Sequence, residues 1–315
     1  MAGLDWKSYA DQLQILKDRG LQVGDEAQAL LDLERIGYYC LSGYWYPFRQ
    51  LKAQPAGLSF REDDFIAGST FEDVVALYVF DKNLRLLALD ALERIERALR
   101  VDVAYLLGAH DCFAHHNPAL FHGNFATRTI AHGYNSGRTD HAVWLERYEA
   151  LVRQNRRQPF VAHNLTKHQK LPIWVAVEIL DFGALSRLFA GMKFADKEAI
   201  AAKYGLGTGR ELEQWLRSLN LIRNVSAHHS RLWNMNVLEL SPVPQYDAQW
   251  QQLNNARPFL YFCLMQKLLA KISPLSGWRG RFVALASGFP EPDNKAVTAQ
   301  DFGAVPGWEN WGLWA

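Results

Sequence analysis

One long apolar repeat constrains this chain more than any other feature of its sequence. Between residues 74 and 106 the apolar side chains recur three, four or seven positions apart, with one longer step. They are Val74, Leu77, Tyr78, Leu84, Leu87, Leu92, Ile95, Leu99, Val103 and Leu106. This spacing predicts one helix of about ten turns, or two nearly continuous helices, ending near Gly108. The segment Thr70-Phe-Glu-Asp73 has the form of a capping box and predicts where the helix begins.

The opposite side of this repeat carries charged residues at helical spacing. Glu93 lies four residues before Arg97, and Glu96 lies four residues before Arg100. Such pairs are typical of a helix face that lies in solvent and is lightly bridged by ion pairs. We therefore expect this face of the helix to be solvated.

Shorter helical patterns occupy most of the remaining chain. They cover residues 6–19, 25–36, 141–157, 173–192, 196–204, 210–229 and 257–272. Residues 38–48 are rich in aromatic side chains and fit no simple period, so they form either a packing layer under the helices or a base-stacking surface. Residues 51–69 indicate a connector with two short strands. The predicted fold class is all-α.

Composition and charge exclude several classes of protein. The 315 residues are 49% hydrophobic, which argues against a disordered chain. No apolar stretch reaches the roughly 20 residues that a bilayer requires, and the N-terminus shows no basic start before an apolar block. We therefore expect no membrane partner and no secretory signal. The three cysteines are odd in number and far apart, which indicates a reducing, cytoplasmic location.

The chain shows no tandem repeat and no strong linker. We expect one helical domain over residues 1–275 and an irregular, aromatic-rich extension over residues 276–315 that packs on it. The aperiodic residues 109–139 hold five histidines but lack the thiolates and the ligand spacing of a zinc site. The sequence also lacks a phosphate-binding loop, an H-E-x-x-H motif and a C-x-x-C motif. We predict no metal site and no cofactor.

The strongest candidates for chemistry lie near the end of the predicted helix 210–229. Its apolar stripe consists of Leu212, Trp215, Leu216, Leu219 and Ile222. Asn224 and His228 lie four residues apart on the opposite side, and Arg223 lies on the flank, about 140° around from His228. Arg231 follows just beyond the helix. One helix end thus presents an amide, an imidazole and a guanidinium.

Such a set of side chains suits the cleavage of an RNA phosphodiester. The reaction removes a proton from the ribose 2′-OH, returns one to the departing 5′-oxygen, and increases the negative charge on the phosphate oxygens. Histidine exchanges protons near neutral pH, and arginine stays charged and fits phosphate with its planar fork. One histidine is too few for two proton transfers, which points to a second copy across a dimer. The alternative is that Arg223 and His228 only tie helices together.

The wider sequence resembles a known family. Arg223-Asn-Val-Ser-Ala-His228 has the R-x(4–6)-H form of the HEPN superfamily. The motif region 219–234, with Leu-Ile-Arg-Asn-Val-Ser-Ala-His-His-Ser-Arg-Leu-Trp-Asn at its end, resembles the Abi-like proteins of bacterial abortive infection, the AbiD/AbiF type. Further blocks occur in the same order, among them Leu16-Lys-Asp-Arg-Gly-Leu21, Leu77-Tyr-Val-Phe-Asp81 and Leu92-Glu-Arg-Ile-Glu-Arg97. The resemblance covers roughly residues 5–275.

The resemblance implies a HEPN-like helical bundle, commonly dimeric, in which Arg and His of both protomers line one composite active site. Members are regarded as metal-independent endoribonucleases that restrict phage by damaging RNA. Arg223 and His228 match the Arg and His of the motif and Asn224 its polar second position, so these three are the predicted catalytic residues. The expected partners are an RNA substrate, a second copy of the chain, and an antitoxin RNA or protein.

Further residues are candidates for supporting or RNA-binding roles. His229 belongs to the family signature, and its helical position favours packing or support of the site. Arg231 either contacts phosphate or caps the helix. The candidates for holding the RNA backbone, which alternatively form an ordinary solvated basic patch, are Arg156, Arg157, Lys167 and Lys170.

The predicted function is therefore that of a metal-independent endoribonuclease in phage defence, acting through attack by the 2′-OH. Two alternatives use the same residues. One is a non-catalytic RNA-binding module, and the other is a toxin component controlled by an RNA or protein partner.

Overall fold

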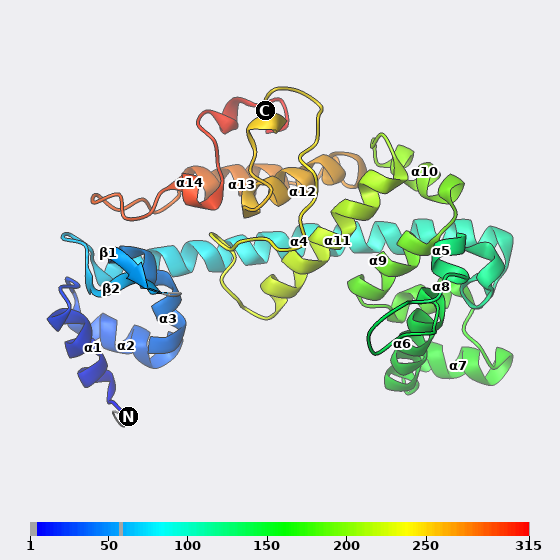
Figure 1. Cartoon of the computed structure of the whole chain (residues 1–315), viewed down its shortest axis with the longest axis horizontal. Helices are drawn as coiled ribbons and strands as arrows, with labels where there is room; N and C mark the ends of the chain where they lie inside the picture. Colours follow the sequence, from blue (N-terminus) through cyan, green and yellow to red (C-terminus); the bar gives the residue numbers. More distant parts are fainter. Residues whose placement is uncertain (1–4, 57–58, 315) are drawn as a thin grey trace.

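One helix organises the whole molecule. The computed structural model describes residues 5–56 and 59–314, and α4, Phe71–His110, runs through it as a single unbroken helix of 40 residues (Figure 1). At 1.5 Å per residue this helix is about 60 Å long. The Thr70 hydroxyl accepts the Asp73 N–H (3.0 Å) and caps its first turn. The prediction of an all-α fold with one long helix is confirmed.

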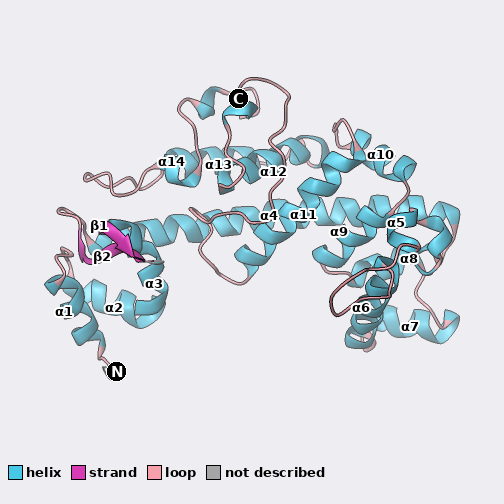
Figure 2. Ribbon diagram, in the orientation of Figure 1, coloured by secondary structure: helices cyan, strands magenta, loops and turns pink. Residues whose placement is uncertain are grey.

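The other elements follow in the order that Figure 1 labels. Before α4 come α1 Tyr9–Asp18, α2 Glu26–Ile36, α3 Tyr38–Trp45, β1 Arg49–Ala56 and β2 Ser59–Phe65. After it come α5 Gly123–Ala126, α6 Asp140–Asn155, α7 Pro159–His168, α8 Ile173–Ala176, α9 Phe182–Gly191, α10 Phe194–Lys203, α11 Gly209–Ala227, α12 Pro258–Ile272, α13 Trp278–Ser287 and α14 Ala299–Phe302. In the described part of the chain, the two strands form one antiparallel hairpin (Figure 2).

Three groups of elements pack along α4. The first three helices and the hairpin lie at its N-terminal end, α5 to α10 gather around its C-terminal end, and α12 and α13 run beside it (Figure 1). The core follows the predicted repeat, with Leu84, Leu92 and Leu99 fully buried. Of the helices described, none is both long enough and apolar enough to cross a bilayer.

Two predictions near the N-terminus need correction or refinement. Helix α1 begins after Ser8 rather than at residue 6, because the side chains of Ser8 and Asp11 form the capping box there. The aromatic residues 38–48 form α3 and a 3-10 turn. Tyr44 and Trp45 are buried under the neighbouring helices, so these side chains act as a packing layer.

The predicted helix over residues 173–192 is wrong, because the chain breaks between α8 and α9. The Asp181 carboxylate accepts the Ala184 N–H (2.7 Å) and starts α9. Arg100, expected on a solvated face, is instead largely buried and donates to the carbonyls of Glu178 (3.1 Å) and Leu180 (2.7 Å). The guanidinium thus satisfies carbonyls that the interrupted helix leaves open.

Two further helices of ten residues each were not predicted, nor were the short helices α5 and α14. Residues 278–287 form α13, so the irregular structure expected for the C-terminal extension is wrong there, although the extension does pack on the body. Its Trp278 indole N–H donates to the Leu87 carbonyl of α4 (2.8 Å). Residues 159–168, interpreted only as part of a basic stretch, form α7 with Pro159 in the first turn. The division at residue 275 stays a prediction.

Candidate active site

Helix α11 carries the candidate catalytic residues. Its predicted apolar stripe is buried in full, from Leu212 to Ile222. The helix packs against α4, α9 and α12, and the Thr208 hydroxyl caps its first turn by accepting the Glu211 N–H (3.1 Å). Because one side of α11 is buried in this way, the polar residues on the other side are placed towards solvent.

The helix ends in a tight reversal immediately after the motif. The His228 N–H still donates to the Asn224 carbonyl (3.0 Å), and the next two N–H groups donate backwards to carbonyls of the last turn. His229 adopts a left-handed conformation with φ of 57°, at a position that glycine usually occupies in such a helix end. Both His228 and His229 are exposed at the end of α11.

Arg223, Asn224 and His228 line one groove. The groove has a volume of about 1250 Å³ and lies between α6, α9 and α11, with α5 and the loop residue Glu239 at its edges. Arg223 is half-buried, and its guanidinium donates to the Asn224 side-chain oxygen (3.3 Å). The structure therefore brings the three predicted catalytic residues together, with an amide that orients the guanidinium.

The other predicted residues do not line this groove. Arg231 is half-buried, and its guanidinium donates to the Gly43 carbonyl, which ties the loop after α11 to α3. His229 lies at the tip of the helix end, outside the groove lining. The exposed basic candidates at the end of α6 and along or just after α7 also lie outside the lining; they are Arg156, Arg157, Lys167 and Lys170.

A buried carboxylate, not identified from the sequence, fixes the loop that follows the motif. Asp81 of α4 is fully buried, and its carboxylate accepts the backbone N–H groups of Leu232 (3.1 Å) and Trp233 (2.7 Å). The Tyr44 hydroxyl (2.6 Å) and the Arg85 guanidinium donate to the same carboxylate. Burial and the adjacent carboxylate raise the pKa of Tyr44, so its hydroxyl remains a donor. The sequence feature that could have indicated this network is the pair Asp81 and Arg85, which lie four residues apart within an apolar repeat.

The histidine-rich region packs against α6. The imidazole of His115 is fully buried, and its ring contacts the rings of Trp144 and Tyr148. Burial lowers the pKa of His115 to about 3. His122 accepts the Phe125 N–H (3.2 Å) and caps α5 at the edge of the groove. Across residues 5–56 and 59–314, no cluster of three or more His, Cys, Asp or Glu side chains is placed to hold a metal ion.

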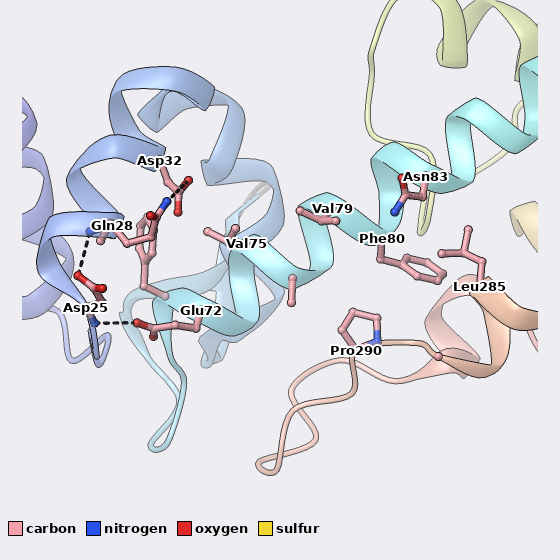
Figure 3. Close-up of a pocket in the computed structure, with 14 residues that line it drawn as sticks. Asp25, Gln28, Asp32, Glu72, Val75, Val79, Phe80, Asn83, Leu285 and Pro290 are labelled. Carbon is pink, nitrogen blue, oxygen red and sulfur yellow. Dashed lines mark hydrogen bonds between the residues drawn. The ribbon is translucent and has the colours of Figure 1, made fainter.

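A second, smaller hollow has a different character. It has a volume of about 510 Å³ and lies between α2, the start of α4 and the segment after α13 (Figure 3). Val75 and Val79 contribute apolar surface to its lining. Its carboxylates accept local hydrogen bonds: Glu72 accepts the Asp25 N–H (3.2 Å), and Asp32 accepts the side-chain amide of Gln28 (3.2 Å). Since no His, Lys or Arg is among the described residues that line it, this hollow lacks the cationic and proton-transfer groups of the α11 groove.

The fold and the groove thus define a protein of the all-α class with an Arg-Asn-x-x-x-His motif at the exposed end of a helix. The family model of the Abi-like proteins matches residues 32–234, from within α2 to the loop after α11. The chain belongs to this family, and the membership suggests a role in phage defence. No curated protein and no solved structure matches the chain.

Proposed function

We propose that this protein is a metal-independent endoribonuclease of the HEPN type that acts in phage defence. The observation that carries the proposal is that Arg223, Asn224 and His228 line one open groove. The groove therefore offers a proton-transfer group and a fixed cation on the same wall, which are the groups that phosphodiester cleavage requires. The Abi-like family of the chain supports the role in defence.

In the proposed reaction His228 accepts the proton of the ribose 2′-OH while that oxygen attacks phosphorus. The bond between phosphorus and the 5′-oxygen breaks, and the departing oxygen takes up a proton. The products are a 2′,3′-cyclic phosphate and a 5′-hydroxyl. Arg223 donates hydrogen bonds to the phosphate oxygens where negative charge increases, and Asn224 holds the guanidinium by accepting its N–H.

The reaction needs an acid as well as a base. We propose that two copies of the chain form a composite active site, in which the second copy supplies the other imidazole. The exposure of His228 at the end of α11 leaves its ring accessible to a second copy. In this arrangement one imidazole removes the 2′-OH proton and the other protonates the leaving oxygen.

The test is cleavage of a fluorescent RNA by purified protein in the presence of EDTA. We expect His228→Ala to lower the cleavage rate by about 10²- to 10⁴-fold, because a proton-transfer group is lost. Arg223→Ala is expected to lower it by about 10²- to 10³-fold, as for removal of a donor to developing charge. His168→Ala, an exposed histidine of α7 outside the groove, is the control and should cleave like the parent protein.

Each variant is checked by circular dichroism and thermal unfolding, so that a loss of rate is not confused with a loss of fold. Unchanged cleavage by His228→Ala and Arg223→Ala would contradict the proposed roles. RNA binding by the parent protein without any turnover would favour the alternative, a non-catalytic RNA-binding module.

A further inference from the structure

The groove extends well beyond the three candidate catalytic residues. Three more arginines line it, Arg147 from α6, Arg187 from α9 and Arg217 from α11. Their side chains are 62%, 60% and 74% exposed, respectively. Arginine forks exposed along one groove are suited to bind the oxygens of several phosphates.

Each of these arginines is paired with a carboxylate that also lines the groove. Arg147 pairs with Asp181, Arg187 pairs with Asp140 (3.4 Å), and Arg217 pairs with Glu239 (2.5 Å). Two of the pairs join α6 and α9, one at the start of each helix, and the third joins α11 to the loop that follows it.

We propose that Arg147, Arg187 and Arg217 bind backbone phosphates of a single-stranded RNA, and that their three carboxylates occupy the phosphate positions while no RNA is bound. The inference rests on the proposed function, because it extends the site of RNA cleavage along the groove. It assigns the hold on the RNA backbone to the groove rather than to the basic surface of α6 and α7.

The geometry of α11 supports a continuous path for the RNA. Arg217 and His228 are eleven residues apart, which is close to three full turns, so they lie on one line about 16 Å apart along the helix. Asn224 lies on the same line and also faces the groove. Arg147 and Arg187 stand on the facing helices, α6 and α9. An RNA strand that lies along α11 therefore contacts Arg217 beyond the scissile linkage, and Arg147 and Arg187 across the groove.

The size of the groove fits a single strand. Pockets for drug-sized ligands measure about 300–1000 Å³, and this groove, at about 1250 Å³, has room for a few nucleotides. Asn124 and Asn220 add amide donors and acceptors to its lining.

Exchange of carboxylate for phosphate is energetically accessible. Exposed ion pairs of this kind contribute about 0–1 kcal/mol, so little stability is lost when one opens. A phosphate offers the same fork-to-oxygen geometry as a carboxylate, and binding of a polyanion also releases its condensed counterions. The carboxylates therefore weaken RNA binding without preventing it, and neutralising one of them is expected to strengthen binding.

The experiment measures binding of a short fluorescein-labelled single-stranded RNA to the full chain carrying His228→Ala, which slows cleavage by about 10²- to 10⁴-fold under the proposed function. Fluorescence anisotropy at several salt concentrations gives the affinity and its salt dependence. Arg147→Gln, Arg187→Gln and Arg217→Gln, added singly, should each weaken binding and reduce the slope of log K against log salt by about 0.7, the value for one phosphate contact on a single strand. Arg156→Gln and Arg157→Gln, outside the groove, should leave the slope unchanged.

Glu239→Gln tests the exchange. It should tighten RNA binding by up to about fivefold, because the ion pair of Glu239 with Arg217 no longer competes with the phosphate for the guanidinium. Its matched control is Glu146→Gln. This change removes the same charge from Glu146 of α6, which pairs with Arg138 of the preceding loop (2.7 Å) outside the groove lining, and should change affinity less.

The results separate the two proposals. This inference would be overturned if the slope of log K against log salt were unchanged in all three groove variants and reduced in Arg156→Gln or Arg157→Gln. That result would leave the proposed cleavage at His228 intact. Equal affinity gains from Glu239→Gln and Glu146→Gln would overturn the exchange of carboxylate for phosphate. Conversely, reduced slopes in the groove variants together with an absence of cleavage by the parent protein would uphold the RNA path and refute the proposed ribonuclease.

Discussion

His115 places a buried imidazole beneath the helix that forms one wall of the groove. No hydrogen-bond partner for either ring nitrogen is present in the described part of the chain, and the ring packs edge-on against Tyr148 (4.9 Å between centroids). Tyr148 lies on α6, the helix that also contributes Arg147 to the groove. Protonation of His115 would bury an unpaired charge, so acid should destabilise this part of the fold.

The size of the effect follows from the pKa. Burial lowers the pKa of His115 from its ordinary value of 6.5 to about 3. Between these two values the unfolded chain binds a proton that the folded chain does not, so the free energy of unfolding falls as pH decreases below about 6.5. The loss contributed by His115 is about 2 kcal/mol at about pH 5. Burial also lowers the pKa of His116, which acts in the same direction.

The assay compares the parent protein with His115→Phe by urea unfolding at about pH 7.5 and about pH 5. Phenylalanine keeps the ring contacts and loses no hydrogen bond, so the variant should fold. Its loss of stability on acidification should be smaller than that of the parent by about 2 kcal/mol. His168→Gln, which alters an exposed histidine, should lose as much as the parent. An identical loss in His115→Phe would refute the assignment of this pH dependence to His115.

Three further changes test other parts of the structure. Asp81→Asn should lower the free energy of unfolding by about 3–5 kcal/mol, because it leaves a buried guanidinium without its countercharge. His229→Gly should raise that free energy by about 1 kcal/mol, because glycine adopts the left-handed conformation without steric cost. Gly191→Ala should lower it by about 1–3 kcal/mol, because a Cβ there would lie 2.4 Å from the Phe125 ring. Thermal and urea unfolding measure all three.

Matched variants control these measurements. Asp90→Asn alters a more exposed carboxylate on the same helix as Asp81, which pairs with Arg94 (3.1 Å) and with Arg281 (2.6 Å), and should lower stability by at most about 1–2 kcal/mol. Gln169→Gly alters another residue with a left-handed φ, 62°, and should stabilise the protein as His229→Gly does. A loss for Asp81→Asn no larger than that for Asp90→Asn would contradict the role of the buried carboxylate.

The parts of the fold that could be predicted are those that local pattern determines. The central helix was predictable because its repeat is long and its cap, Thr70, stands directly before it. The stripe of α11 was predictable for the same reason, and it placed Asn224 and His228 on the polar side. Strong periodicity and a cap are both properties of a few neighbouring residues, so a single sequence records them.

The missed features depend on contacts between distant segments. The break between α8 and α9 is stabilised by Arg100, about 80 residues earlier, so the apolar pattern of residues 173–192 alone predicted one helix. From the sequence, Asp81 is only a charged residue in an apolar repeat. Its role depends on the backbone N–H groups of residues 232–233, which are about 150 residues away in the chain and donate to its carboxylate. Likewise, the arginines of the groove come from three helices whose arrangement the sequence does not record.

The unbroken course of α4 restricts how the length of this chain can change. Asp81 holds the loop after the motif, and Arg100 holds the segment before α9, so both segments are positioned by the same continuous helix. One residue inserted between Asp81 and Arg100 would rotate one anchor by about 100° relative to the other and shift it by about 1.5 Å. No surface loop separates the two anchors to absorb such a change in phase. Insertions are therefore tolerable in the connecting loops but not within residues 82–99.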